Sequence, residues 1–361
     1  MKKKKKLLPV PVLVIIDALL IGVCLCVYAL FHHVLPSWGL NTYQPITPVS
    51  VSTPAPTPTP TPTPTPIASA EPEETEAPVE EVQIDYGQFG EKFQDKFTTD
   101  GEVIQTENLY ASENVRVELI DDRMYNSDVH IVDIYVRNID SLRTTFANGD
   151  EVFDGKRDTV VNMAERVNAV AAINGDYCGF IQGGEYVVFR NGLYFYSNPT
   201  RAVCVLYNDG TMKTFWKPYN QTGDDFDIEA EIQAGAWQMW SFGPALLDGE
   251  GHALDLYYDP NQPRSMIGYY EPGHYCFVTV EGRSNTNVGV TLTELASIAE
   301  SLGCTVAFNL DGGGSSTLTF GGELISIGSP NEGLREITDT IYIVDTLPAE
   351  DSAVQTEEDT Q

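Results

Sequence analysis

Basic residues are scarce in this chain and are unevenly placed. The sequence has 21 Lys and Arg against 52 Asp and Glu, which gives a formal net charge of −31 at pH 7. Five of the basic residues are Lys2 to Lys6, and neither Lys nor Arg occurs between Leu7 and Glu91. Because a protein that binds nucleic acid needs a positive surface for the phosphate backbone, this balance excludes nucleic acid as a partner.

Cysteine is also sparse, and no Cys or His spacing is typical of a zinc site. Four of the 6 cysteines lie in the predicted globular part, namely Cys178, Cys204, Cys276 and Cys304. This number permits two disulfides in three pairings, whereas the apolar neighbours of each cysteine favour buried reduced thiols. The surplus of carboxylates offers hard oxygen ligands, so Ca²⁺ is the one cofactor that the composition suggests, at a metal site that is unknown.

Long apolar runs are missing except at the N-terminus. Val12 to Leu30 is apolar apart from Asp17 and is long enough to cross a bilayer. The lysines before it predict a cytoplasmic N-terminus. A cleaved signal peptide is the alternative, but no small-x-small cleavage motif follows the run. The sequence therefore predicts a basic cytoplasmic head over residues 1–11 and a transmembrane anchor over residues 12–35, with the rest of the chain extracellular.

Proline is concentrated in one low-complexity segment. Thr53 to Pro66 alternates Thr and Pro, broken only by Ala55. Proline fixes φ and removes a hydrogen-bond donor, so this segment favours extended polyproline II. We expect an extracellular linker over residues 36–85, rich in Thr, Pro and acidic residues, that reaches on the order of 100 Å. The polar, acidic residues 347–361 are predicted to form a disordered tail.

Residues 86–346 have the pattern of a globular domain dominated by short strands. Apolar and β-branched runs such as 115–120, 129–136 and 276–280 are separated by turn signals that contain glycine. Only two helices are predicted, over 158–168 and 292–302, and the second has a capping box at Thr291 and Glu294. The fold class that follows is α+β: a mixed or antiparallel, strand-rich domain with two main helices.

Each predicted helix leads into a buried strand and then into a polar turn that contains glycine. The first strand ends at Asn174-Gly175-Asp176, and the second ends at Asn309-Leu310-Asp311 followed by Gly312-Gly313-Gly314. We expect both strand ends to deliver polar groups to one cleft, although a chance likeness between short segments is the alternative. Consecutive glycines let backbone N–H groups approach an anion. A plain glycine hairpin turn is the competing interpretation of the second turn.

Four blocks of this sequence, in order, resemble the phosphodiester glycosidase family, which includes bacterial exopolysaccharide-associated proteins. They are Ser241 to Leu247 (SFGPALL), Pro263 to Gly268 (PRSMIG), Val278 to Arg283 (VTVEGR) and Gly289 to Ser316, which ends in AFNLDGGGSS. The Asn174 turn is similar to the family's N-G-G-F/Y turn. Two departures stand out: Glu281 replaces the usual Asp, and Asp176 replaces the second Gly.

The resemblance implies hydrolysis of a sugar-1-phosphodiester in a cell-surface glycopolymer or exopolysaccharide. Asp311 and Glu281 are the predicted catalytic carboxylates, since each follows an apolar run and is expected at a strand end. Arg264 and Arg283 are predicted to bind the phosphate. An ordinary surface ion pair is the other interpretation of Glu281 and Arg283. The full set of predicted binding residues is Asn174, Gly175, Asp176, Arg264, Arg283, Asn309, Gly312, Gly313, Gly314 and Ser315.

The rival function is a non-catalytic protein on the same fold that binds cell-surface polysaccharide or assists exopolysaccharide assembly. A carbohydrate polymer is the expected partner in both cases. Tyr177, Phe180 and Trp240 are candidate sugar-stacking platforms for either function. Activity on a sugar-1-phosphodiester distinguishes the two.

Overall fold

The structure, a computed structural model, describes residues 49–50, 86–179, 184–217, 221–256 and 259–345. The predicted membrane anchor, most of the predicted linker and the acidic tail lie outside these residues. Among the described residues, none of the helices has the length and apolar character that a membrane span requires.

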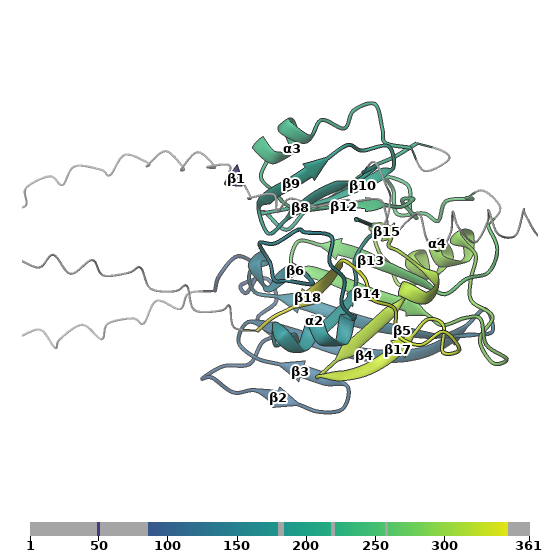
Figure 1. The fold of residues 1–361 in the computed structure, drawn as a ribbon. Coiled ribbons are helices and arrows are strands. Elements are labelled where there is room, and N and C mark those ends of the chain that lie inside the picture. The colour runs from purple at the N-terminus through teal and green to yellow at the C-terminus, as the bar shows by residue number, and fades with distance from the viewer. Residues whose placement is uncertain (1–48, 51–85, 180–183, 218–220, 257–258, 346–361) are drawn as a thin grey trace, which may run out of the picture. The chain divides into compact units, whose positions relative to one another are not determined.

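Three antiparallel sheets form the described domain (Figure 1). The six-stranded sheet has the order β1 (Val49–Ser50), β9 (Leu193–Ser197), β8 (Val187–Arg190), β12 (Ala236–Phe242), β10 (Ala202–Tyr207), β11 (Met212–Phe215). The seven-stranded sheet has the order β15 (Val306–Asn309), β13 (Arg264–Glu271), β14 (His274–Val280), β5 (Ser127–Val136), β4 (Val115–Met124), β3 (Leu109–Ala111), β2 (Ile104–Gln105). The five-stranded sheet has the order β17 (Glu323–Ile327), β16 (Thr317–Phe320), β7 (Ala171–Asn174), β18 (Asp339–Ile343), β6 (Leu142–Phe146). The strand-rich α+β class is therefore confirmed.

The predicted hairpin turns join neighbouring strands in the structure. They connect β8 to β9, β10 to β11, β13 to β14 and β16 to β17. The β13–β14 turn shows the local cause: Gly273 has a φ of 89°, which a residue with a Cβ adopts only at a cost. Local turn chemistry thus sets the register of these pairs.

Both predicted helices are present, and a third was not predicted. α2 spans Val160–Arg166, and α4 spans Leu292–Ser301 with the expected capping box between Thr291 and Glu294. The additional helix, α3, spans only Ile228–Gln233, and the Asp227 carboxylate caps it by accepting from the N–H groups of residues 229 and 230. The part of the chain that the structure describes also contains two 3₁₀ turns, η3 (Ile139–Ser141) and η4 (Gly313–Ser315).

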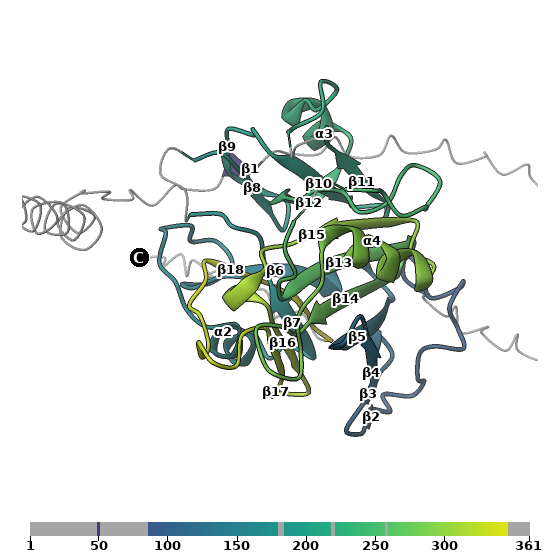
Figure 2. The same cartoon turned by 90° about the vertical axis from the view of Figure 1, so that its right-hand side faces the viewer.

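The seven-stranded sheet is buried on both faces at β14, one of its inner strands. On β14, Tyr275 and Phe277 belong to the main core that also includes residues of the five-stranded sheet. Cys276 and Val278, which alternate with these two residues along the strand, point the other way into a second cluster with residues of α4. This alternation follows from the period of two in a strand. Figure 2 shows α4 beside β13 and β15, and α2 beside the five-stranded sheet. The ends of β7 and β15 consequently meet within the protein.

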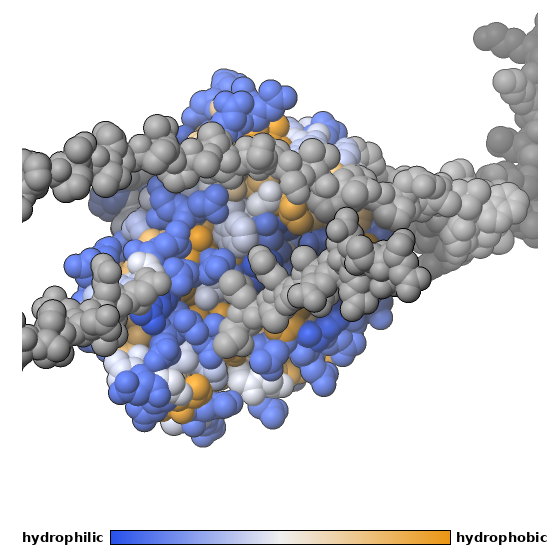
Figure 3. Space-filling model, turned by 90° about the vertical axis from the view of Figure 1, so that its left-hand side faces the viewer, coloured by the Kyte–Doolittle hydropathy of each residue, from blue (hydrophilic) through white to orange (hydrophobic). Residues whose placement is uncertain are grey.

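The face of the domain in Figure 3 is mostly hydrophilic. Hydrophobic residues on it form small separate groups, as expected for an ordinary solvent-exposed surface.

Candidate functional site

The polar turns after β7 and β15 lie against each other. The Asn174 side-chain NH₂ donates to the main-chain oxygen of Asp311 at 2.8 Å, and the Asp311 N–H donates to the Gly175 oxygen at 3.4 Å. The expected meeting of the two strand ends is therefore confirmed. The Asn174 oxygen accepts from the Ser265 hydroxyl at 2.7 Å and from the Thr317 N–H at 3.2 Å. This buried amide is fully used within the protein, so it holds Asp311 in place and does not face a sugar.

Asp311 has the properties of a reactive carboxyl. It is 7% exposed, its Oδ1 accepts from the Gly312 N–H at 2.9 Å, and its Oδ2 has no hydrogen-bond partner among the described residues. Burial raises the pKa of Asp311 to about 6, against the opposing effects of Ser315, Gly312 and Arg335. A carboxyl with a pKa near the working pH and an unpartnered oxygen is suited to proton exchange.

The glycine turn makes room for a neighbouring side chain, and two of its N–H groups already have acceptors within the protein. The Gly312 N–H donates to Asp311, and the Gly313 N–H donates to the Pro263 oxygen at 2.8 Å. In this structure these two amides serve protein acceptors, which differs from the expected ring of amides around a phosphate. A Cβ on Gly313 would lie 3.0 Å from Nη2 of Arg283, so the glycine makes room for this guanidinium.

Two arginines flank the glycine turn. Arg283, a predicted site residue, donates through Nη1 to Oε1 of Glu332 at 2.8 Å and through Nε and Nη2 to Gln262. Arg335, which was not predicted, donates to the Ser315 hydroxyl at 3.4 Å and to Oε2 of Glu332 at 3.3 Å. The Glu332 carboxylate thus bridges the two guanidinium groups. Arg335 lies in a polar segment that contains no motif, so the sequence gave no reason to select it.

Glu281 lies in a different set of contacts from Asp311. Its Oε2 accepts from the Asn287 side chain at 2.8 Å, and its Oε1 lies 3.6 Å from Nε2 of His130. The other His130 nitrogen is 2.6 Å from Oδ1 of Asp121. Burial lowers the pKa of His130, but the hydrogen bonds and charges of Glu281 and Asp121 outweigh burial and raise it overall. The structure therefore brings Arg283 to the glycine turn, whereas the carboxylate of Glu281 faces an imidazole.

Two more of the predicted residues, Arg264 and Asn309, hold neighbouring segments. Arg264 is 8% exposed, pairs with Asp259 and donates to the main-chain oxygens of residues 260 and 290. Asn309 is buried and donates to the Gly243 oxygen at 2.7 Å. In this structure, neither side chain is directed at an open site. Trp240 is likewise fully buried, and its indole donates to Thr144, so it offers no sugar-stacking surface. Phe180 lies outside the described residues.

A buried ion-pair network beneath the Asn174 turn was missed by the sequence analysis. Arg190 is 0% exposed and donates to Oδ2 of Asp339 through Nε at 3.0 Å and Nη2 at 2.9 Å. The same Nη2 donates to Oδ2 of Asp176 at 2.9 Å. Asp176 also accepts from the N–H groups of Cys178 and Ser241. The prediction that Asp176 binds substrate therefore conflicts with its complete burial and its saturated carboxylate.

This network ties the six-stranded sheet to the five-stranded sheet, because Arg190 ends β8 and Asp339 begins β18. The Asp339 carboxylate lies over Gly175: a Cβ there would be 2.2 Å from Oδ1 of Asp339. That explains why glycine occupies position 175. One sequence signal was present, since Arg190 is a single charge at the end of an apolar run, 187–189, shortly before the turn glycine Gly192.

Asp176, Cys178 and Asp339 form the one group of three potential metal ligands within the described residues. The Arg190 guanidinium already pairs with both carboxylates at 2.9 Å. A thiol is a poor ligand for a hard ion, so this group does not suit Ca²⁺. The predicted Ca²⁺ remains a prediction without a site.

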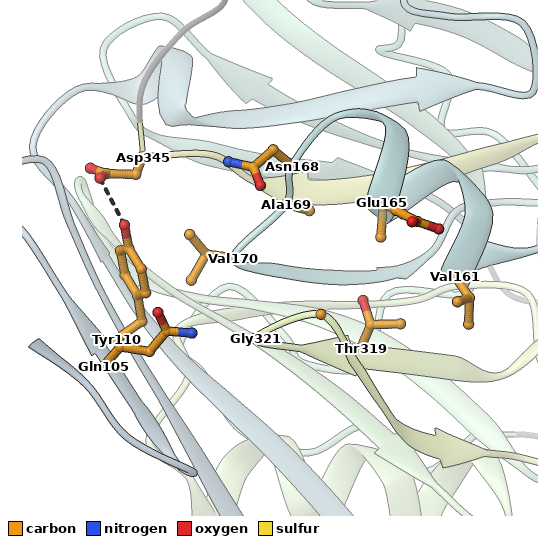
Figure 4. Close-up of a pocket in the computed structure, with 12 residues that line it drawn as sticks. Gln105, Tyr110, Val161, Glu165, Asn168, Ala169, Val170, Thr319, Gly321 and Asp345 are labelled. Carbon is orange, nitrogen blue, oxygen red and sulfur yellow. Dashed lines mark hydrogen bonds between the residues drawn. The ribbon is translucent and has the colours of Figure 1, made fainter. Parts of the chain in front are cut away.

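The cavity in Figure 4, of about 570 Å³, lies away from these residues. It is lined by parts of β2, β3, α2, the β16–β17 turn and Asp345, whose Oδ2 accepts from Tyr110 at 2.9 Å. Val170, just before β7, lines it, whereas Asn174 ends β7. The cavity is thus at the opposite end of β7 from Asp311, and none of the predicted site residues lines it.

Comparisons with known proteins agree with the motifs. Residues 167–344 match the family model described as phosphodiester glycosidase. This range contains Asn174, Glu281, Arg283 and Asp311, together with the newly found Arg190, Arg335 and Asp339. An uncharacterised SPbeta prophage-derived protein of Bacillus subtilis (strain 168), YomE, is 33% identical over 200 residues, which are 52% of this chain and 30% of that protein. The chain therefore spans less than a third of this curated relative.

Solved structures with a similar fold include the zebrafish N-acetylglucosamine-1-phosphodiester α-N-acetylglucosaminidase catalytic domain, auto-inhibited by its pro-peptide. It matches with a TM-score of 0.51 and 19% identity, over 69% of this chain and 85% of that one. A hypothetical protein from Synechocystis matches with a TM-score of 0.49 and 16% identity, over 68% of this chain and 64% of that one. The zebrafish match supports the fold alone.

Proposed function

Since residues 167–344 carry a domain of the phosphodiester glycosidase family, we propose that this protein hydrolyses a sugar-1-phosphodiester and releases the sugar and a phosphomonoester. The observation that carries the proposal is Asp311. It is a buried carboxyl with a pKa raised to about 6 and an unpartnered Oδ2, held beside the glycine turn. Arg283 and Arg335 flank the same turn. A reactive carboxyl beside two guanidinium groups suits a substrate in which a sugar is joined to a phosphate.

Arg283 and Arg335 are the proposed phosphate-binding residues. Both lie over glycines, since a Cβ on Gly313 would meet Arg283 and a Cβ on Gly314 would meet Arg335. Their shared partner, Glu332, supplies a carboxylate where the phosphate of a substrate would bind. A bound phosphate would take over these charge-assisted hydrogen bonds and would be stabilised as it becomes a leaving group. Arg264, proposed for the same task from the sequence, is held by Asp259 instead.

Asp311 is the proposed reacting carboxylate. When ionised, it can take a proton from an attacking water or attack the anomeric carbon directly. Because a phosphomonoester leaves readily, the reaction depends more on stabilising the departing anion than on a strong general acid. Glu281 is the proposed second carboxylate, and His130, 3.6 Å from it, can exchange a proton with it. Asn174 holds the main chain of Asp311 in position.

The proposed setting is the cell surface. The lysine-rich head, the apolar run and the Thr/Pro linker support a single-pass anchor with the domain outside the membrane. Protease treatment of intact protoplasts tests this, because residues after 35 should be cleaved from outside. A soluble mature protein that begins near residue 36 would contradict the anchor. A glycopolymer of the cell surface is the proposed substrate.

The decisive assay incubates the full-length protein with a panel of sugar-1-phosphodiesters and measures the released reducing sugar. The panel begins with N-acetylglucosamine, the sugar in the name of the zebrafish protein. Asp311→Asn, which is nearly isosteric, is expected to lower kcat by a factor on the order of 10³ or more at an unchanged melting temperature. Arg283→Ala is expected mainly to raise KM, because it removes a phosphate contact.

The panel also separates the proposal from the non-catalytic alternative. Tight binding of the polymers without release of sugar from any of them would favour a polysaccharide-binding or assembly protein. Full activity of Asp311→Asn would remove Asp311 from the mechanism even if hydrolysis is observed.

A further inference from the structure

Two buried cysteines lie side by side, remote in sequence from each other. Cys276 is in the middle of β14, and Cys304 follows α4 just before β15. Their sulfur atoms are 3.8 Å apart, and the residues are 0% and 3% exposed. Both sulfurs lie over Gly268 of β13, where a Cβ would be 2.6 Å from the Cys276 sulfur and 2.8 Å from the Cys304 sulfur. The missing side chain at Gly268 is therefore the space that both thiols occupy.

We propose that Cys276 and Cys304 form a redox-active dithiol, which closes to a disulfide when it meets an oxidant of the low-molecular-weight disulfide class. The inference is independent of the proposed glycosidase activity. The two thiols are free in the structure and are already in contact. Cys276 is held by strand pairing on both sides, with Gly268 and with Asp133. Cys304 lies in a connection next to Gly303, whose φ is 81°, so this side supplies the movement that shortens the sulfur–sulfur distance to a bond.

The other two cysteines of the domain lie in separate surroundings. Cys178 packs in the cluster around Phe153 and lies 4.0 Å from Nη2 of Arg190. Cys204 is in the middle of β10 and belongs to the main core. Of the pairs that these four cysteines could form, the structure brings together only Cys276 and Cys304.

The exchange is balanced and needs only the named oxidant. The Cys304 thiol loses its proton, and its thiolate attacks one sulfur of the small disulfide, breaking that S–S bond and releasing one small thiolate. Cys276 then loses its proton and attacks the Cys304 sulfur of the mixed disulfide, releasing the second small thiol. The protein has lost two electrons and two protons, and the small disulfide has gained them. The hydrogen bond from Cys276 lowers the pKa of Cys304, which fits Cys304 as the first nucleophile.

Closure would fasten the start of β15 to β14. β15 leads directly into Asn309 and Asp311, so the bridge would fix the strand that carries the proposed reacting carboxylate. It would also close a loop that contains α4 and so restrict the unfolded chain. We therefore expect the oxidised protein to melt roughly 5–10 °C above the reduced protein.

The test treats the folded full-length protein with oxidised glutathione, blocks the remaining thiols with maleimide and maps peptides under non-reducing conditions. The expected product contains residues 276 and 304 in one linked peptide pair, about 2 Da lighter than the two thiol peptides. Cys276→Ser and Cys304→Ser should abolish the oxidant-dependent rise in melting temperature. The matched controls, Cys178→Ser and Cys204→Ser, should retain it.

Peptide mapping of the unmodified sequence needs no variant, so it decides the matter even if a serine variant folds poorly. Maleimide labelling of both Cys276 and Cys304 after prolonged oxidation of the folded protein would overturn the proposal. A linkage of either residue to Cys178 or Cys204 would overturn it as well. Gly268→Ala is expected to slow closure several-fold, because its methyl group would occupy the space between the sulfurs.

Discussion

Replacing Arg190 by Met should lower the free energy of unfolding by about 3–5 kcal/mol at pH 7, because two buried carboxyl groups lose their cationic partner. Arg190 makes three ionic hydrogen bonds of 2.9–3.0 Å, two to Asp339 and one to Asp176. It also donates to the main-chain oxygens of Met239 and Phe189. All three side chains are 0% exposed, so solvent cannot replace the lost partner. Met retains most of the side-chain volume, so the loss of stability comes mainly from the missing charge and only to a small extent from poorer packing.

The size of this loss should depend on pH, with a sign that the structure fixes. Burial already raises the pKa of Asp339, and Arg190 opposes that rise. Without Arg190, the effect of burial on the Asp339 carboxyl is less opposed, so that group favours the protonated form more strongly in the folded state. A group whose pKa is higher in the folded than in the unfolded protein loses its stabilising contribution as the pH rises above the ordinary carboxyl pKa of about 4. Because Asp339 has a pKa of about 7 in the natural protein, it ionises in the fold as the pH rises through 7, and the difference from Arg190→Met should grow over that range.

The assay is urea unfolding at several pH values between 4 and 8, followed by tryptophan fluorescence. Arg335→Met is the matched control, since its side chain is 41% exposed and its ion pair should contribute less than about 1 kcal/mol. If Arg190→Met is too unstable at pH 7, the double variant Arg190→Met/Asp339→Asn should recover part of the stability, because it removes one of the two buried carboxyl groups that have lost their partner. A loss under 1 kcal/mol that does not vary with pH would refute the reasoning.

Two further predictions concern the proposed active site. The kcat/KM for a sugar-1-phosphodiester should rise through an apparent pKa near 6, because Asp311 must lose its proton and burial holds its pKa at about that value. A profile that stays flat from pH 5 to 7 would exclude Asp311 as the group that must ionise. Glu332→Gln should strengthen binding of inorganic phosphate about 2- to 5-fold, since the carboxylate that occupies Arg283 and Arg335 is removed. Isothermal titration against Glu336→Gln, in the same loop, shows whether the gain belongs to this bridge or to net charge.

Most of the local structure could be predicted because its causes are local. The capping box at Thr291 and Glu294 starts α4 where expected, and the glycine turns join the strands that flank them. α3 escaped prediction because it is six residues long, and it packs the partly buried Ile228 and Ile232 against the core beside the buried Glu231. Short helices depend on tertiary packing more than on their own sequence.

The candidate site could be predicted where it consists of strand ends. Asn174 and Asp311 follow buried runs, and they meet as expected. What their side chains do there was not predictable. The sequence shows that Asp176 is acidic, but only the fold shows that an arginine 14 residues later pairs with it and with an aspartate from the last strand.

The sequence by itself determined the charge balance, the apolar run, the proline linker, the strand-rich class and the motifs that indicate the family. Each of these depends on residues that are neighbours in the chain. The tertiary structure alone decided that Arg335 joins Arg283 at the glycine turn, that Glu281 faces His130, and that Cys304 pairs with Cys276. These contacts join residues far apart in sequence, and their energy depends on burial and distance, which exist only once the sheets have packed.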